Sequence, residues 1–410
     1  MDVFTLCEKA KLASIRLSST TTEQKNAWLL SIADALDNRV DEILSSNAID
    51  MARGENLSPV MRDRLLLTRE RVARISDGVR DLVSLPDPVG RVLSHHVQKD
   101  GLDITRVSVP IGVVGVIYEA RPNVTVDVAT LCIKSGNCVV LRGGKDAINT
   151  NRALAKVVKE ALGEWSECVQ FIDDETREST GLLLKADKYV DVIIPRGGEK
   201  LKEYILQNTK IPVICSAGGV CHTYVEKTAD LKKAKEIVKN AKLQRPSVCN
   251  ALETLLVDEE VAEEFLPVVL SEMKAEKNIR VYGDEATKAI YPDTEIIDEE
   301  GYNTEYLDYA LSVKVVSGVE EAISHINTHG TKHSDAILTE DMCKAEKFIL
   351  SVDTADVYVN ASTRFTDGYE FGLGAEVAIS TQKLHARGPV GLNELTTYKT
   401  IIRGNGQIRK

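Results

Sequence analysis

Apolar positions in the first 85 or so residues recur at helical spacing. In the stretch 22–36 the positions that share this spacing are Ala27, Leu30, Ile32, Ala33 and Leu36. The prolines at 86 and 88 end the helical region, because the residue before a proline is disfavoured in the helical conformation. From 90 to 109 the apolar positions alternate instead, around a Lys-Asp-Gly turn at 99–101, and this pattern predicts a β-hairpin.

Short apolar runs alternate with amphipathic stretches from residue 110 to about 225. The predicted strands are 113–118, 138–141, 169–172, 190–194 and 223–225. The predicted helices between them are 149–162, 176–184 and 198–207. This alternation predicts a parallel sheet covered by helices, the architecture of nucleotide-binding domains. A second α/β region is expected from about 226 to 384, and the stretch 395–403 is predicted to form a final strand.

Composition narrows the class of protein. At 410 residues the chain is long enough for two or three domains, and 43% hydrophobic with 28% charged residues is typical of a soluble globular protein. The net charge of −11 argues against nucleic acid as the main partner. The sequence contains neither an apolar run long enough to cross a membrane nor a secretory signal, so we expect a cytoplasmic protein with no membrane partner.

The eight cysteines are scattered and include no Cys-x-x-Cys pair, which argues against a structural zinc site. We therefore expect free, mostly buried thiols, as in a reducing cytoplasm, and no metal in the functional site.

One cysteine differs from the others in its context. Cys249 lies in the polar stretch 244–250, between a predicted helix at 230–242 and a predicted strand at 252–257. Arg245 is close in sequence, and a nearby positive charge favours the thiolate that acts as a nucleophile. This segment alone leaves a second interpretation open, in which Cys249 is a small, buried and inert thiol.

Two further segments carry polar groups at the ends of predicted strands, where ligands bind in α/β folds. Asn123 follows an apolar, glycine-containing strand and either aims its amide at a substrate oxygen or caps the next helix. Ser362, Thr363 and Arg364 lie in a polar loop after a short strand, and such groups are suited to holding an anion.

Two glycine pairs close predicted strands, in Arg142-Gly143-Gly144 and in Arg196-Gly197-Gly198. Glycine lets the backbone approach a phosphate, and the second pair opens a helix whose N-terminal N–H groups can hold an anion. A Gly-x-Gly-x-x-Gly fingerprint is absent, and two ordinary strand-to-helix turns would have the same pattern. The pairs are therefore candidates for a nucleotide site.

The order of these segments over nearly the whole chain resembles the aldehyde dehydrogenase superfamily. The motifs that carry the resemblance are Arg-Pro-Asn at 121–123, Leu-Arg-Gly-Gly at 141–144, Gln-Arg-Pro-Ser-Val-Cys at 244–249, Thr-Glu-Tyr-Leu-Asp at 304–308 and Asn-Ala-Ser-Thr-Arg-Phe-Thr-Asp-Gly at 360–368. The resemblance implies an α/β fold with a Rossmann-type cofactor domain, an α/β catalytic domain and a small β oligomerisation flap. The implied ranges are 1–96 and 110–221 for the cofactor domain, 222–384 for the catalytic domain, and 97–109 with 385–410 for the flap and C-terminal segment.

The same resemblance implies roles for individual residues. Cys249 is the expected nucleophile, and the Asn123 amide with the Cys249 N–H is expected to hold the oxyanion. The expected cofactor residues are Arg142, Gly143, Gly144 and Lys145 near the adenosine ribose, Arg196, Gly197 and Gly198 near the pyrophosphate, and Glu305 on the nicotinamide-side ribose. Without the resemblance, Glu305 could be an ordinary surface carboxylate. The cations at 142 and 145 favour NADP over NAD, because they can neutralise a 2′-phosphate.

One departure from the superfamily pattern bears on the reaction. Hydrolytic members carry a glutamate that activates water, whereas this chain has Cys215 or Ser216 at the matching place. An acyl-enzyme would then need another acceptor, either phosphate or a coenzyme thiol. Phosphate suits the arginines in the motif loops, Arg121, Arg245, Arg364 and Arg387, although Arg387 is equally well explained by a structural ion pair.

We therefore expect an NADPH-dependent reductase of L-glutamyl 5-phosphate in proline biosynthesis, which is the branch of the superfamily that the chain resembles. The expected substrate-binding residues are Arg121, Arg245, Ser362, Thr363 and Arg364. A homo-oligomer, either a dimer or a tetramer, is expected, with a glutamate 5-kinase as a further possible partner. The alternatives are a coenzyme A-acylating aldehyde dehydrogenase and a catalytically idle nucleotide-binding or assembly protein.

Overall fold

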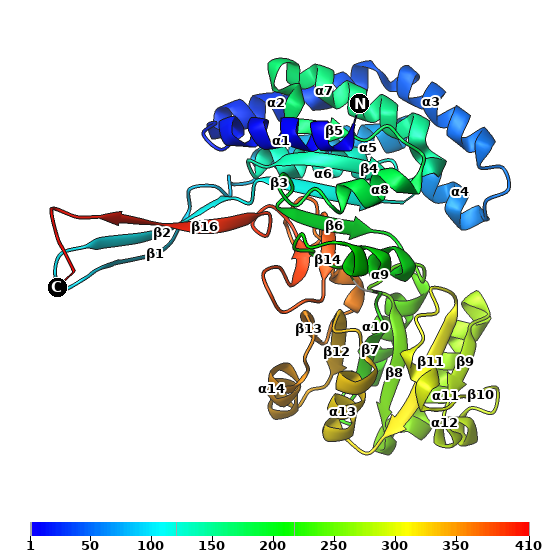
Figure 1. The fold of residues 1–410 in the computed structure, drawn as a ribbon. Helices are drawn as coiled ribbons and strands as arrows, with labels where there is room; N and C mark the ends of the chain where they lie inside the picture. Colours follow the sequence, from blue (N-terminus) through cyan, green and yellow to red (C-terminus); the bar gives the residue numbers. More distant parts are fainter. Residues whose placement is uncertain (1, 120, 217, 410) are drawn as a thin grey trace. The chain divides into compact units, whose positions relative to one another are not determined.

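The computed structural model describes residues 2–119, 121–216 and 218–409 (Figure 1). The chain divides into two compact units. Unit 1 comprises Met1–Ser216, Gly372–Ala378 and Pro389–Lys410, and unit 2 comprises Ala217–Phe371 and Ile379–Gly388. The chain thus passes between the units near residue 216, where the sequence interpretation set a domain boundary at 221.

Unit 1 combines N-terminal helices with a parallel sheet whose strand order is β5-β4-β3-β6. Its strands are β3 (Val113–Tyr118), β4 (Cys138–Gly143), β5 (Val169–Phe171) and β6 (Val192–Arg196). The N-terminal helices are α1 (Val3–Leu17), α2 (Thr22–Asn38), α3 (Val40–Arg53), α4 (Pro59–Leu65) and α5 (Arg69–Ser84). The connecting helices are α6 (Val124–Lys134), η1 (Lys145–Ala147), α7 (Ile148–Leu162), η2 (Gly163–Cys168), α8 (Arg177–Leu183) and α9 (Glu199–Asn208). The predicted alternation of strands and helices is confirmed.

A second sheet of unit 1 has the order β1-β2-β16 and is antiparallel. It contains β1 (Val92–Val97), β2 (Asp103–Pro110) and β16 (Thr396–Arg403). Figure 1 shows these strands extending away from the helices of the same unit. Every residue of β1 is exposed, so β1 is an open edge. The predicted hairpin and final strand are confirmed, while their role in oligomerisation stays a prediction.

Unit 2 is built on a parallel sheet with the order β10-β9-β11-β8-β7-β12-β13. The strands are β7 (Cys221–Val225), β8 (Leu252–Asp258), β9 (Arg280–Gly283), β10 (Glu295–Ile296), β11 (Ala310–Val316), β12 (Ser334–Leu338) and β13 (Asp356–Val359). The helices are α10 (Leu231–Leu243), α11 (Glu259–Lys277), α12 (Glu285–Ile290), η3 (Glu299–Asn303), α13 (Val319–His329), α14 (Met342–Ser351) and η4 (Thr363–Phe365). The strands β14 (Ala378–Ser380) and β15 (Gly388–Val390) form a separate small sheet, and the division between the two units falls within both strands. All of β8 is buried, so the loop that precedes it is attached directly to the core of unit 2.

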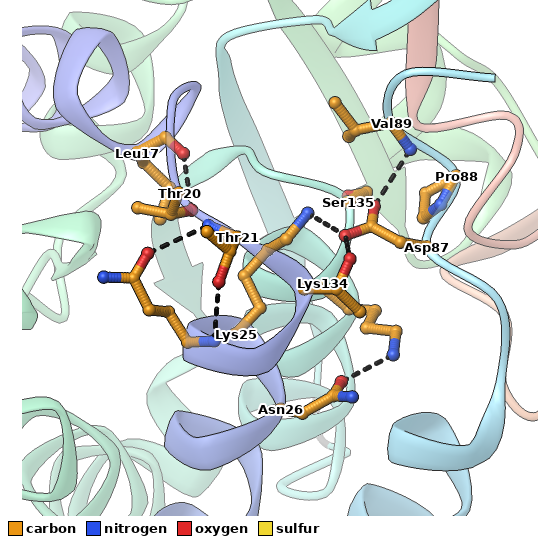
Figure 2. Close-up of polar contacts among 12 residues, drawn as sticks. Leu17, Thr20, Thr21, Lys25, Asn26, Asp87, Pro88, Val89, Lys134 and Ser135 are labelled. Atoms are coloured by element: carbon orange, nitrogen blue, oxygen red, sulfur yellow. Dashed lines mark hydrogen bonds and ion pairs between the residues drawn. The ribbon is translucent and has the colours of Figure 1, made fainter. Parts of the chain in front are cut away.

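The inward face of α2 differs from the predicted one. Leu30 is 43% exposed, whereas the charged side chain of Lys25 is buried. The buried residues of the helix are Lys25, Leu29, Ile32, Ala33 and Leu36. Lys25 can lie inside because its Nζ pairs with Asp87 Oδ2 at 2.5 Å. Beside it, Lys134 Nζ donates to Asn26 Oδ1 at 2.7 Å, so polar contacts join α2 to both α6 and the segment before β1 (Figure 2).

All eight cysteines are free thiols, as predicted. Six are buried, Cys249 is half-buried and Cys343 on α14 is exposed. Among the described helices, none is both long and apolar enough to span a membrane.

Candidate functional site

Cys249 lies in the turn between α10 and β8, as the sequence predicted, and is half-buried. Its carbonyl oxygen accepts a hydrogen bond from the Cys221 thiol, with Sγ at 3.1 Å. Gly219 packs against the same carbonyl so closely that an added Cβ would lie 1.4 Å from the oxygen. Only glycine fits at 219, and the backbone of the nucleophile candidate is therefore held from one side by the strand-leading segment 219–221.

Glu305 is attached to this glycine segment. Its Oε1 accepts the N–H of Gly219 at 2.7 Å, and a Cβ on Gly218 would lie 2.3 Å from its Oε2. The carboxylate is half-buried and has a defined partner, so it is not the free surface group that the short motif left possible. Glu305 and Cys249 thus contact neighbouring parts of one backbone segment.

The loop at 360–368 is joined to Cys249 through the next residue, Asn250. The Asn250 amide donates to the carbonyl oxygen of Thr366 at 2.8 Å, and Thr363 Oγ1 donates to the Asn250 carbonyl at 2.8 Å. Asn250 is buried, and the sequence analysis missed it. The available signal was its position, a polar residue in a turn directly before an apolar strand. This pairing places Ser362, Thr363 and Arg364 beside the cysteine loop.

Two arginines contribute positive charge near Cys249. Burial and the neighbouring Arg245 guanidinium lower the pKa of Arg364, while the Cys249 and Asp367 side chains oppose that shift. Arg364 Nε donates to Gln244 Oε1 at 2.8 Å, which fixes the guanidinium over the same turn. Positive charge beside a thiol stabilises its thiolate, and it also suits an anionic substrate.

Ser362 and Thr363 are buried and bonded within the protein. Ser362 Oγ accepts the N–H of Arg364 at 3.3 Å, and the hydroxyl of Thr363 makes the bond to Asn250 described above. Of the three predicted loop residues, Arg364 is therefore the one whose charged end remains partly exposed.

The two glycine turns lie at the C-terminal ends of neighbouring strands of the unit 1 sheet, on either side of β3. Tyr118, the last residue of β3, pairs in register with Gly143 of β4 on one side and Arg196 of β6 on the other. The chain runs from β3 through β4 to β5 and then crosses to β6 on the opposite side, so the strand order reverses at β3. Ligands bind at such switch points in open α/β sheets. The prediction that both turns follow strand ends is confirmed.

The cations in the first turn differ in accessibility. Arg142 is buried, and its guanidinium donates to the carbonyls of Gly143 at 2.9 Å and Thr176 at 2.7 Å. Burial lowers the pKa of Arg142. Lys145, at the start of η1, is exposed. A Cβ on Gly143 would lie 2.2 Å from the Asn151 amide nitrogen, so this glycine is required by packing within the unit.

A carboxylate occupies the start of α9. Gly198, the N-cap residue of α9, donates its N–H to Glu119 Oε2 at 3.3 Å, and a Cβ on Gly197 would lie 2.7 Å from Glu119 Cδ. Acidic groups are favoured at a helix N-terminus because they interact with its free N–H groups. Glu119 follows β3 directly, and the sequence analysis missed it. In this structure it takes the position predicted for a phosphate.

Asn123 does not cap α6 with its side chain. Its Nδ2 instead donates to Asp127 Oδ2, one helical turn later, at 2.8 Å. Burial raises the pKa of Asp127 to about 6, while the hydrogen bond from Asn123 and the charge of Arg196 oppose the rise. Asn123 is thus the N-cap residue of α6 by position, but its side chain makes no capping hydrogen bond. Asn123, exposed Arg121 and the glycine turns all belong to unit 1, whereas Cys249, Glu305 and Arg364 belong to unit 2.

Cys215 and Ser216, which stand where hydrolytic family members carry a glutamate, are held within unit 1. Burial raises the pKa of the Cys215 thiol, and Ser216 Oγ donates to the Pro195 carbonyl at 3.4 Å.

Arg387 donates to Asp353 Oδ1 at 2.8 Å in unit 2, and Lys332 and Lys383 contact the same carboxylate. Arg387 therefore belongs to a structural ion-pair cluster.

Comparison with known proteins defines the class first. The family model described as Aldehyde dehydrogenase family matches residues 1–289, so the chain belongs to this family. The predicted aldehyde dehydrogenase-like fold is confirmed, and an acetylating aldehyde dehydrogenase from Geobacillus thermoglucosidasius shares it at 18% identity, with a TM-score of 0.69 and coverage of 100% of this chain and 97% of that one.

More similar relatives define the group within the family. The chain is 50% identical over 407 residues to a gamma-glutamyl phosphate reductase from Syntrophomonas wolfei, covering 98% of this chain and 97% of the relative. It is 52% identical to one from Clostridium perfringens, covering 98% of each. The crystal structure of gamma-glutamyl phosphate reductase from Thermotoga maritima is 44% identical, covers 100% of both chains and superposes with a TM-score of 0.97. The chain therefore groups with the gamma-glutamyl phosphate reductases.

Proposed function

We propose that the protein reduces L-glutamyl 5-phosphate to L-glutamate 5-semialdehyde and phosphate with NADPH, a step of proline biosynthesis. The observation that carries the proposal is the identity of 50% and 52% over nearly the whole chain to relatives named for this reaction. The half-buried thiol of Cys249, with Arg245 and Arg364 beside it, supports the chemistry.

In the proposed reaction, the Cys249 thiolate attacks the acyl carbon of the substrate. A carbon–sulfur bond forms, the carbon–oxygen bond to phosphate breaks, and phosphate leaves with the bonding electrons. The guanidinium groups of Arg245 and Arg364 hold the leaving phosphate or the carboxylate of the amino-acid end, and Arg121 is a further candidate for these anions. The resulting thioester is reduced to the aldehyde level, and the carbon–sulfur bond then breaks, which releases glutamate 5-semialdehyde and regenerates the Cys249 thiolate.

The oxyanion of this step is assigned to the Cys249 N–H and the Asn123 amide. An amide nitrogen has two hydrogens, so Asn123 can donate one to Asp127 and aim the other at the substrate. Asp127 then acts as a positioning residue, because its carboxylate fixes the direction of the amide.

The cofactor assignment is NADP. When bound, NADPH supplies the hydride that reduces the thioester carbon. The glycine turns at 143–144 and 197–198 fit a dinucleotide, because both lie at the switch point of the sheet and an added Cβ on Gly198 would meet nothing within 4 Å, which leaves room for a close approach to the backbone there. Exposed Lys145 is the cation that we assign to a 2′-phosphate, Glu119 would give way to the pyrophosphate at α9, and Glu305 is assigned to the nicotinamide-side ribose.

The test exploits the missing carboxylate at 215 and 216. With purified protein, glutamate semialdehyde and NADP⁺, we expect NADPH formation only when phosphate or arsenate is added, because no base there activates water. A full rate in phosphate-free buffer would show thioester hydrolysis and contradict the proposal. Restoration by coenzyme A alone would identify an acylating dehydrogenase, and no turnover under any condition would indicate an idle protein.

We further propose a cytoplasmic homo-oligomer, a dimer or a tetramer, with glutamate 5-kinase as a possible partner that supplies the labile acyl phosphate. The open edge of β1 supports self-association, since Val92, Leu93 and Val97 are 63%, 50% and 61% exposed. Light scattering at micromolar concentration should give a mass above that of one chain. A monomer there would contradict the proposal.

A further inference from the structure

We propose that Glu299, His325 and His329 form a binding site for a divalent transition metal, with zinc as the best match. The site lies within unit 2, on η3 and α13, and is independent of the proposed reductase function. One ring nitrogen of each histidine and one carboxylate oxygen of Glu299 all lie within 4.8 Å of one another. The cysteine pattern that argued against zinc in the sequence does not concern this set.

The two histidines share one face of α13. They are four residues apart, the spacing that brings side chains together on a helix, and their ring centroids are 4.4 Å apart. His325 is only 5% exposed, and among the described residues its Nε2 has no hydrogen-bond partner. A buried polar atom without a partner is unfavourable, and a bound metal would satisfy the imidazole.

His329 is oriented as metal-binding histidines are. Its Nδ1 lies 2.9 Å from Asn303 Oδ1, and a neutral ring that donates Nδ1–H to this oxygen has its lone pair on Nε2. That Nε2 lies 3.2 Å from Glu299 Oε2. In that tautomer the Nε2 lone pair faces the Glu299 carboxylate, and a cation between the two would be coordinated by both. A hydrogen bond from the other ring nitrogen to a neighbouring oxygen is the usual support of a histidine ligand.

The surroundings allow the coordination geometry. Zinc binds nitrogen and oxygen at about 2.0–2.2 Å, so ligand atoms around one ion lie within roughly 4 Å of one another. The side chain of Glu299 is 70% exposed and can make the small movement required. Lys314 Nζ contacts Glu299 Oε1 at 2.8 Å and leaves Oε2 directed at His329. Imidazole donors favour zinc, nickel or copper over magnesium or calcium.

Two further polar residues, His222 and Asn303, lie beside the proposed metal ligands. The His222 ring lies 5.4 Å from that of His325, with its Nδ1 3.1 Å from Asp335 Oδ1. The Asn303 that supports His329 precedes Glu305 by two residues. A metal at this site would therefore fasten η3 to α13 and restrain the segment that leads to Glu305.

Zinc titration against a chelating dye tests the site. The parent is the full-length chain with Cys249→Ser and Cys343→Ser, which removes the half-buried and exposed thiols as competing ligands. We expect one zinc per chain. His329→Gln and Glu299→Gln should each weaken binding by about 100-fold or more, and Asn303→Ala by about tenfold. Both ligand variants alter partly exposed side chains, so they avoid the folding risk of replacing His325.

The matched control is His95→Gln. His95 Nε2 lies 3.1 Å from Asp103 Oδ1 on the exposed hairpin, a comparable histidine–carboxylate pair outside the proposed metal cluster. Zinc affinity should not change in this variant, and zinc should raise the melting temperature of the parent but not of Glu299→Gln. Equal affinity in the parent and both ligand variants, or no stoichiometric binding by the parent, would overturn the proposal.

Discussion

The strand ends of unit 1 that carry the glycine turns and the cysteine loop of unit 2 are held in place by different kinds of contact. At these strand ends, Gly143 and Arg196 lie on either side of Tyr118, because both pair with it in one sheet. In the loop, Cys249 and Asn250 are held by separate segments, at 219–221 and at 363–366. Regular strand pairing therefore suffices to assemble a backbone-lined site, whereas the thiol site depends on individual side-chain contacts between distant loops.

The two regions also differ in charge. Glu119 lies at the start of α9 beside the glycine turn, while Arg364 interacts electrostatically with both Cys249 and Arg245. Main-chain N–H groups and one exposed lysine suit a dinucleotide in unit 1, and a thiol with guanidinium groups suits an acyl phosphate in unit 2. Substitutions in the cysteine loop should therefore affect chemistry and substrate, and those at the glycine turns should affect cofactor affinity.

The largest effect is expected from Cys249→Ser. Reduction of the acyl phosphate should be abolished, because a hydroxyl is far less nucleophilic than a thiolate, while NADPH binding measured by fluorescence stays nearly unchanged. Cys343→Ser, at the exposed cysteine of α14, is the control and should keep the parental rate. Substantial turnover by Cys249→Ser would remove this residue from the mechanism.

Asn123→Ala should lower kcat by roughly a hundredfold, the usual cost of one lost oxyanion donor. This variant tests whether unit 1 contributes to chemistry as well as to cofactor binding. Asn208→Ala, at the end of α9 where the amide contacts the Tyr204 carbonyl, serves as the control in steady-state assays. If kcat is the same in both variants, Asn123 has only a structural role with Asp127.

Arg364→Gln should raise KM for L-glutamyl 5-phosphate by about 10- to 100-fold, because a charge-assisted hydrogen bond to the substrate is lost. KM for NADPH should change little. Arg280→Gln, which breaks an exposed ion pair with Asp308 in the same unit, is the matched control for steady-state kinetics. An equal rise in both Michaelis constants would contradict the assignment of Arg364 to the substrate.

The smallest effect is expected from Lys145→Ala. KM for NADPH should rise by about tenfold with little change for NADH, since the 2′-phosphate loses its cation. Lys156→Ala on α7, which removes an exposed ion pair with Glu42 of α3, controls for the loss of a surface lysine. Equal effects on the two cofactors would mean that Lys145 does not distinguish them.

Much of the architecture followed from local patterns. The alternation of apolar runs predicted the strands of the unit 1 sheet, and the polar stretch at 244–250 predicted that Cys249 lies in a loop. Periodicity was less informative on α2, where Leu30 is exposed and Lys25 is buried. The ion pair with Asp87 decides that face, and a partner 62 residues away leaves no trace in the spacing of apolar residues.

The sequence by itself determined the order of the elements, the residues at the strand ends and the absence of a carboxylate at 215 and 216. Only the tertiary structure decided that Arg142 is buried while Lys145 is exposed, and that Asn250 holds a loop 113 residues further along the chain. The physical reason is that periodicity reports which face of an element is apolar. It does not report which distant donor meets which acceptor, because that depends on how loops close after the sheets have packed.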